Sequence, residues 1–177
     1  MKLQCPLMDN EIKGFKCGNA SIEAQIEDSY YITLLKQAYG YKIVIDGMQV
    51  GYYMLYFKEI KLDIINNIMG DDYLSNMVEY YTAVHIRYIA IDKRVQNQGI
   101  GTIVFKGILS ELIKLSEKYP IRIITLDALA KYYEWYKKIG FKDIPGKESD
   151  GITYPMYMDC MTQKDADKLD EFQGSLC

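Results

Sequence analysis

Metal ligands and paired cysteines are scarce in this sequence. Its 177 residues contain one histidine, and the four cysteines, Cys5, Cys17, Cys160 and Cys177, form no CxxC pair. Zinc sites need ligands in close pairs, and disulfide-stabilised domains need a denser set of cysteines. The composition therefore predicts reduced thiols and no bound metal.

Long apolar runs are also absent from the sequence. No stretch reaches the roughly 18 apolar residues that a membrane-spanning helix needs. The N-terminal segment MKLQCPLMDNEIKGFK lacks the apolar core of a signal peptide. Because cytoplasmic proteins keep their thiols reduced, we expect a cytoplasmic protein with no membrane partner.

Neither sign of charge dominates the chain. The 21 lysines and arginines against 24 aspartates and glutamates give a net charge of −3. This implies no whole-surface attraction to nucleic acid, although a local basic patch stays open. The chain is 49% hydrophobic and 25% charged, as soluble globular proteins are. Its length suits one domain, which we place at residues 1–161, followed by a polar tail at 162–177.

The order of the expected elements predicts a mixed α/β fold. Apolar runs flank Asp46-Gly47, a dipeptide that forms tight two-residue turns, so residues 41–57 are expected to form a β-hairpin. An apolar strand at 82–91 precedes an amphipathic helix that begins near Gly99. The elements expected after it are a strand at 121–126, a helix at about 129–139 that ends at Gly140, and strands that begin at 141 and 153.

A glycine-containing loop joins the strand at 82–91 to the long helix. Its sequence is Gln96-Asn97-Gln98-Gly99-Ile100-Gly101-Thr102. Glycines at a helix start let backbone N–H groups and the positive end of the helix dipole bind an anion such as phosphate. The loop lacks the Lys-Ser/Thr of the GxxxxGK[ST] pattern. Val104 also stands where a dinucleotide-binding loop has its third glycine.

Two linked motifs resemble those of one enzyme superfamily. The run Ile89–Gly101, IAIDKRVQNQGIG, resembles motif A of the GNAT N-acetyltransferases, with its Q/R-x-x-G-x-G/A core. The run Trp135–Phe141, WYKKIGF, is similar to the FY-x-x-x-GF ending of that superfamily. The resemblance covers about residues 40–160. It implies a central, mostly antiparallel twisted sheet with helices on both faces.

The resemblance also implies an activity and roles for residues. The protein would transfer an acetyl group directly from acetyl-CoA, its cosubstrate, to a primary amine. The backbone of Gln96–Thr102 would bind the pyrophosphate, and the strand Ile89–Ile91 would diverge from its neighbour and polarise the thioester carbonyl. Tyr136, singled out among 17 tyrosines by its spacing to Gly140, takes the general-acid position. The implied cofactor-binding residues are Ile89, Ala90, Ile91, Gln96, Asn97, Gln98, Gly99, Ile100, Gly101 and Thr102.

The acceptor amine is not fixed by these motifs. The segment FKCGN at 15–19 and the segment Asp127–Ala130 look like a GNAT branch that includes bacterial toxins acetylating aminoacyl-tRNA. A small molecule, a peptide or an aminoacyl-tRNA therefore all stay open as acceptors. A tRNA would need a basic groove for its phosphates. The residues expected near the cleft mouth that would supply it are Lys93, Arg94, Lys131, Lys137 and Lys138.

The general base is equally open. By strand alternation, His85 and Arg87 share a face with Ile89 and Ile91. If that face lines the cleft, His85 is a candidate base, since its ordinary pKa suits the task. Glu59 and Glu79 are further candidates.

A second class of function stays open beside the enzyme. Many GNAT members carry an asparagine seven residues before the tyrosine, where this chain has Leu129. That difference favours a non-catalytic acyl-CoA-binding or interaction module with the same fold. Tyrosine doublets such as Tyr52-Tyr53 suit either a homodimer interface or strands with one side in the core.

Overall fold

The computed structural model describes residues 2–4, 12, 14–61 and 80–175. In chain order the elements are β1 (Lys2–Gln4), α1 (Ala20–Glu27), α2 (Ser29–Leu34), β2 (Tyr39–Ile45), β3 (Met48–Lys61), β4 (Tyr80–Ile91), the 3₁₀ turn η3 (Lys93–Val95), α4 (Ile100–Ser116), β5 (Ile123–Leu129), the 3₁₀ turn η4 (Ala130–Tyr132), α5 (Tyr133–Ile139), β6 (Lys142–Asp143), β7 (Thr153–Asp159) and α6 (Gln163–Gly174).

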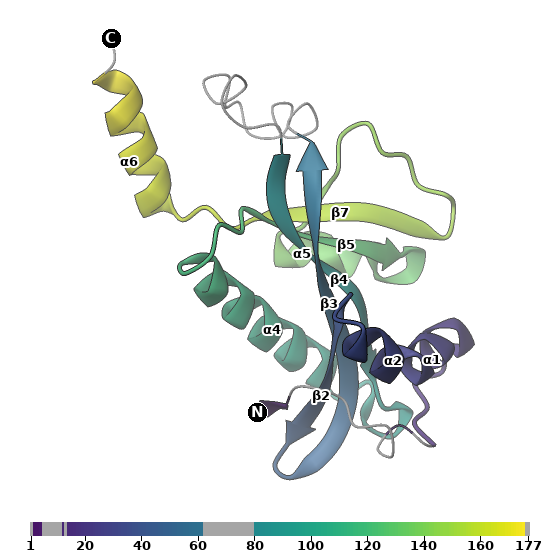
Figure 1. The fold of residues 1–177 in the computed structure, drawn as a ribbon. Coiled ribbons are helices and arrows are strands. Elements are labelled where there is room, and N and C mark those ends of the chain that lie inside the picture. The colour runs from purple at the N-terminus through teal and green to yellow at the C-terminus, as the bar shows by residue number, and fades with distance from the viewer. Residues whose placement is uncertain (1, 5–11, 13, 62–79, 176–177) are drawn as a thin grey trace.

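One twisted seven-stranded sheet, in the order β1-β2-β3-β4-β5-β7-β6, forms the centre of the fold. The β4–β5 pair is parallel, and the other five pairs are antiparallel. Helix α4 and the α1–α2 pair lie on opposite sides of the sheet (Figure 1). The predicted mixed α/β fold, with a mostly antiparallel sheet and helices on both faces, is confirmed.

The described residues bury three apolar clusters against the sheet, and the two largest lie on opposite faces. The larger cluster joins the sheet to α4 and α5 around Phe105, and the smaller one joins it to α1 around Ile26. Tyr52 and Tyr53 are both buried, one in each cluster, because successive strand residues point to opposite faces. This doublet therefore belongs to the core.

The hairpin and the long helix lie where the sequence places them. Asp46 and Gly47 connect β2 to β3 with φ angles of 50° and 79°, as a tight two-residue turn requires. Helix α4 begins directly after Gly99 and buries one stripe of side chains against the sheet. The buried residues of that stripe are Val104, Phe105, Ile108, Leu109 and Leu112.

The second predicted helix begins later than expected. Leu129 still belongs to β5, where it pairs with Thr153 of β7, so its backbone is held extended. The 3₁₀ turn η4 follows, and α5 starts only at Tyr133. The end of this helix is as predicted, with Gly140 in the left-handed conformation at φ 116°. The apolar periodicity therefore predicted a helix that starts four residues too early, because the pairing with β7 keeps Leu129 in a strand.

A β-bulge in β4 reverses the face expected for His85. Met54 of β3 pairs with Tyr88 and Leu55 pairs with Ile86, so Arg87 has no opposite residue. The extra residue shifts the alternation by one position. Ile86 and Ile89 therefore share the α4 face, whereas His85 points to the α1–α2 face. The prediction that His85 shares a face with Ile89 and Ile91 is wrong for this reason.

The C-terminal segment is folded as well as polar. Within residues 162–175, α6 spans Gln163–Gly174 and projects away from the sheet (Figure 1). The domain boundary at residue 161 stays a prediction.

Candidate active site

The main cavity opens where two neighbouring strands separate. β4 and β5 pair from Ala83↔Ile123 to Ile86↔Leu126, and their pairing ends there. β4 then continues beside β3 and β5 continues beside β7. A cavity of about 920 Å³ occupies the resulting opening. It extends from the N-terminal end of α4 to α5.

Most of the residues predicted to bind the cofactor lie on this cavity. Gln98 is exposed beside it, and the side chain of Ile100 packs against the core under α4. The other eight line the cavity: Ile89, Ala90, Ile91, Gln96, Asn97, Gly99, Gly101 and Thr102.

The loop before α4 presents backbone donors to the cavity. Asn97 and Gly99 adopt left-handed conformations, with φ angles of 60° and 77°. Gly99 is the N-cap and has no side chain to cap the first N–H groups of the helix. The N–H of Thr102 donates to the Gly99 carbonyl at 3.1 Å, so those of Ile100 and Gly101 are the donors that suit an anion. The side chain of Gln96 holds the loop in place, because its Nε2 donates to the carbonyls of Ile91 and Cys17, both at 2.8 Å.

Tyr136 lies at the other end of the cavity on α5. Its ring contacts those of Phe105, Trp135 and Phe141, with centroids 4.7–5.9 Å apart. Burial among these rings is the main cause that raises the pKa of the Tyr136 phenol well above its ordinary value of 10.0. The hydroxyl therefore stays protonated at neutral pH, as a proton donor must.

His85 also lines the cavity, but as a neutral group. Its side chain is almost fully buried, and burial together with the nearby Lys58 lowers its pKa from 6.5 to about 3. Its Nδ1 lies 2.9 Å from Thr125 Oγ1 and 3.1 Å from Lys58 Nζ. Of the other candidate bases, Glu59 is exposed on β3 and Glu79 lies outside the described residues.

The structure adds one acidic residue to the site. Asp127 lines the cavity with its side chain 53% exposed, and its Oδ2 lies 3.7 Å from His85 Nε2. The sequence analysis placed Asp127 in a family-like segment but gave it no role. The signal that identifies it is spatial, since the two residues are 42 positions apart on strands that pair in parallel.

The basic residues expected at the cleft mouth differ in their availability. Lys131 lines the cavity. Arg94 is bound to Asp92, with an N–O distance of 2.7 Å, and Lys137 lies 3.6 Å from Asp143. Lys93 and Lys138 are exposed.

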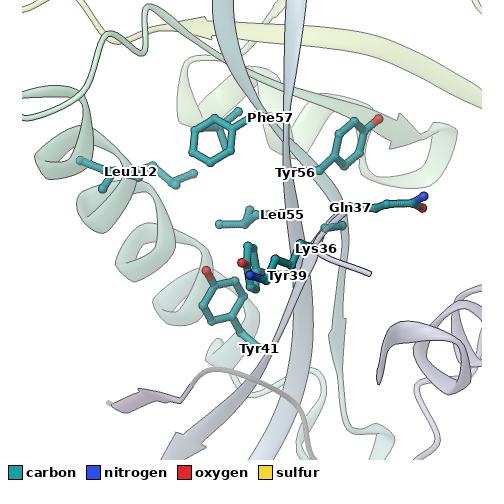
Figure 2. Close-up of a pocket in the computed structure, with 11 residues that line it drawn as sticks. Lys36, Gln37, Tyr39, Tyr41, Leu55, Tyr56, Phe57 and Leu112 are labelled. Carbon is teal, nitrogen blue, oxygen red and sulfur yellow. The ribbon is translucent and has the colours of Figure 1, made fainter. Parts of the chain in front are cut away.

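A second, smaller hollow of about 260 Å³ lies between α4 and the β2–β3 hairpin (Figure 2). Tyr39, Tyr41, Phe57 and Leu112 surround it. The described residues that line it include no carboxylate, imidazole or thiol.

The single histidine makes the stability of the protein pH-dependent. Unfolded His85 binds a proton below its ordinary pKa of 6.5, whereas folded His85 does so only near 3. Between these values the unfolded state binds more protons, so stability falls as the pH falls. We expect the pKa difference of His85 to lower the free energy of unfolding by about 2 kcal/mol as the pH falls from 6.5 to 5.0. Urea unfolding of the native protein and of His85→Gln at both pH values measures this; equal losses in the two proteins would contradict it.

The comparison with family models identifies the chain. Residues 68–160, just over half of the chain, match the acetyltransferase (GNAT) domain. The protein belongs to the GNAT acetyltransferase family. It is accordingly an acyltransferase, and the resemblance noted in its two motifs is confirmed. We found no match among curated protein sequences.

Solved structures share the fold along nearly the whole chain. A bacterial toxin has a TM-score of 0.75 at 15% identity, with 96% of each chain covered. AtaT complexed with acetyl-methionyl-tRNAfMet has a TM-score of 0.68 at 17% identity, with 95% of this chain and 96% of that chain covered. AtaTR bound with AcCoA has a TM-score of 0.68 at 18% identity, with 94% and 97% covered. At these identities the likeness establishes the fold.

Two further features bear on metals and membranes. Among residues 2–4, 12, 14–61 and 80–175, no three His, Cys, Asp or Glu side chains gather into a group that would hold a metal ion. No helix in the same described ranges is long and apolar enough to cross a membrane.

Proposed function

We propose that the protein transfers the acetyl group of acetyl-CoA directly to the α-amino group of an aminoacyl-tRNA. The observation that carries the proposal is the separation of β4 from β5. It gives one continuous cavity with the N-terminal end of α4, whose backbone N–H groups would bind an anion, at one side and Tyr136 at the other. A cofactor with a pyrophosphate and a reactive thioester needs both features.

The cofactor would follow β4 toward the reacting centre. Backbone N–H groups at the start of α4 would hold its pyrophosphate, with the helix dipole favouring the negative charge. The backbone of Ile89–Ile91 lines the cavity next to strand positions that β5 does not pair. Its N–H and C=O groups would bond the pantetheine amides and polarise the thioester carbonyl.

The transfer itself requires little beyond these groups. The lone pair of the amine attacks the carbonyl carbon, and the C–S bond breaks. The departing thiolate takes the proton of the Tyr136 hydroxyl, which then recovers a proton from solvent. The nitrogen loses one proton, so the products are an N-acetylated amine and CoA.

Local basic charge supports tRNA as the acceptor. Although the chain has a net charge of −3, Arg87 and Lys131 line the cavity. Lys58 and Lys147 lie close enough to His85 to lower its pKa. Basic groups of this kind, gathered at one place, would bind the backbone phosphates of a tRNA. The fold is also that of AtaT, which has been solved with acetyl-methionyl-tRNAfMet.

Leu129 is the observation that favours a non-catalytic module instead. Its side chain lines the cavity, where it supplies an apolar surface to a bound acyl-CoA but no hydrogen bond. Binding without turnover would support that alternative.

Calorimetry followed by a transfer assay tests the proposal. Saturable binding of acetyl-CoA, with NADH as the control, is expected first. CoA thiol release should then depend on aminoacyl-tRNA and be absent with deacylated tRNA. Thiol release with a polyamine or a peptide, and not with aminoacyl-tRNA, would identify that amine as the acceptor in place of aminoacyl-tRNA. No binding at millimolar acetyl-CoA would overturn the proposal and the non-catalytic alternative together.

A further inference from the structure

We propose that Asp127 binds the acceptor amine and takes its proton, and that His85 is a positioning residue that orients the Asp127 carboxylate. This inference rests on the proposed function, because it assigns the acceptor end of the same cavity. It differs from the expectation that His85 is the base.

Asp127 lies on the face of the sheet opposite to Tyr136. Its neighbours Leu126 and Ala128 belong to the cluster that contains Tyr136 and α4, so the Asp127 side chain points the other way, toward His85. Asp127 is also the first β5 residue beyond the last β4–β5 pair. An amine bound there reaches the gap between the strands from the face opposite to the general acid. The amine would then enter from one face of the sheet, and the proton for the departing thiolate would come from the other.

His85 has no free lone pair with which to act as the base. A lysine ammonium only donates hydrogen bonds, so Lys58 Nζ, at 3.1 Å, makes Nδ1 of His85 an acceptor. The proton of the neutral ring is therefore on Nε2. That nitrogen lies 3.7 Å from Asp127 Oδ2, and its N–H dipole attracts the carboxylate. Catalytic contacts of this length in a free enzyme commonly shorten when substrate binds.

The charges around Asp127 suit an acceptor that carries an ammonium beside anionic groups. Among the described residues that line the cavity, Asp127 has the one carboxylate, whereas Arg87 and Lys131 are basic. Lys58 and Lys147 add positive charge on the same side, because both lower the pKa of the neighbouring imidazole. A carboxylate within basic surroundings selects an amine that is attached to phosphates.

The proton balance of the transfer is complete with these residues. The bound ammonium first passes one proton through the Asp127 carboxylate to solvent, which leaves a neutral amine with a lone pair. As the amine nitrogen then forms its bond to the carbonyl carbon, a second N–H proton passes to the Asp127 carboxylate. The proton that the CoA thiolate gains comes from Tyr136. Solvent then removes the proton from Asp127 and returns one to Tyr136, so no oxidant or further reactant is needed.

A binding experiment separates this proposal from the proposed function. The probe is adenosine with methionine amide-linked at its 3′ position, and the control probe carries an α-hydroxyl in place of the α-ammonium. We expect the native protein to prefer the ammonium probe by about tenfold, and Asp127→Asn to lose that preference. If Asp127→Asn keeps both the preference and full acetyl transfer, the proposal is overturned. If the native protein acetylates no amine yet shows an Asp127-dependent preference, only the proposed function fails.

Variants of His85 test the positioning role. His85→Ala removes the N–H that faces Asp127 and should raise the KM for the amine several-fold more than it lowers kcat. His85→Gln can place an amide N–H near the position of Nε2, so it should restore most of the lost affinity. Melting curves of both variants control for folding. Equal effects of Ala and Gln, or an unchanged KM for the amine, would overturn the positioning role.

Discussion

Replacing Tyr136 with phenylalanine is expected to lower kcat about 10²–10⁴-fold, the range typical of removing a general acid. The affinity for acetyl-CoA should stay unchanged. The ring is held by Phe105, Trp135 and Phe141, and phenylalanine keeps those contacts. The substitution therefore removes the hydroxyl, whose proton the CoA thiolate would otherwise take. Steady-state kinetics with calorimetry of acetyl-CoA binding measures the two quantities.

Tyr133→Phe is the matched control for this prediction. Tyr133 lies on the same helix, but its hydroxyl donates to Asp143 Oδ2 at 2.8 Å. Loss of the Tyr133 hydroxyl should leave kcat within about threefold of the native value, because a surface hydrogen bond contributes little to the stability of the fold. An unchanged kcat in Tyr136→Phe would make Tyr136 a packing residue. A parallel loss of acetyl-CoA affinity would make it a binding residue.

Truncating Ile108 to alanine is expected to lower the free energy of unfolding by about 2–5 kcal/mol. Ile108 is 1% exposed in the middle of α4, where it joins the helix to the sheet. Removing its outer carbons leaves a cavity that the close-packed surroundings fill only partly. A loss of this size is a large share of the roughly 5–15 kcal/mol that stabilises a domain.

Ile103→Ala on the same helix supplies the control. Ile103 is 60% exposed, so the same chemical change should alter the free energy of unfolding by no more than about 0.5 kcal/mol. Urea unfolding measures the free energy of unfolding of both variants, which is compared through their midpoints when the m-values agree. Equal midpoints for the two variants would contradict the burial pattern of α4.

Local sequence determined much of the fold because its signals involve neighbouring residues. The turn at Asp46-Gly47 and the start of α4 at Gly99 follow from backbone conformations that few residues adopt. The buried stripe of α4 follows from helical periodicity. The positions of Tyr136 and of the loop at 96–102 follow from motifs of fixed spacing, so the two ends of the cavity were predictable.

Tertiary structure alone decided the part of the site that lies between those ends. The bulge at Arg87 depends on how β4 pairs with β3, and it moved His85 to the other face of the sheet. The extended backbone of Leu129 depends on its pairing with Thr153. No short-range pattern records either pairing, because each partner lies far away in the chain.

The contact between His85 and Asp127 illustrates the same division. Sequence by itself supplied a histidine on one apolar strand and a carboxylate directly after another, together with the predicted phosphate-binding loop and the tyrosine. Their meeting required β4 and β5 to pair in parallel and then to separate after Ile86 and Leu126. Functional residues that belong to one segment can be predicted from the sequence. A contact between residues of two strands depends on the register in which those strands pair.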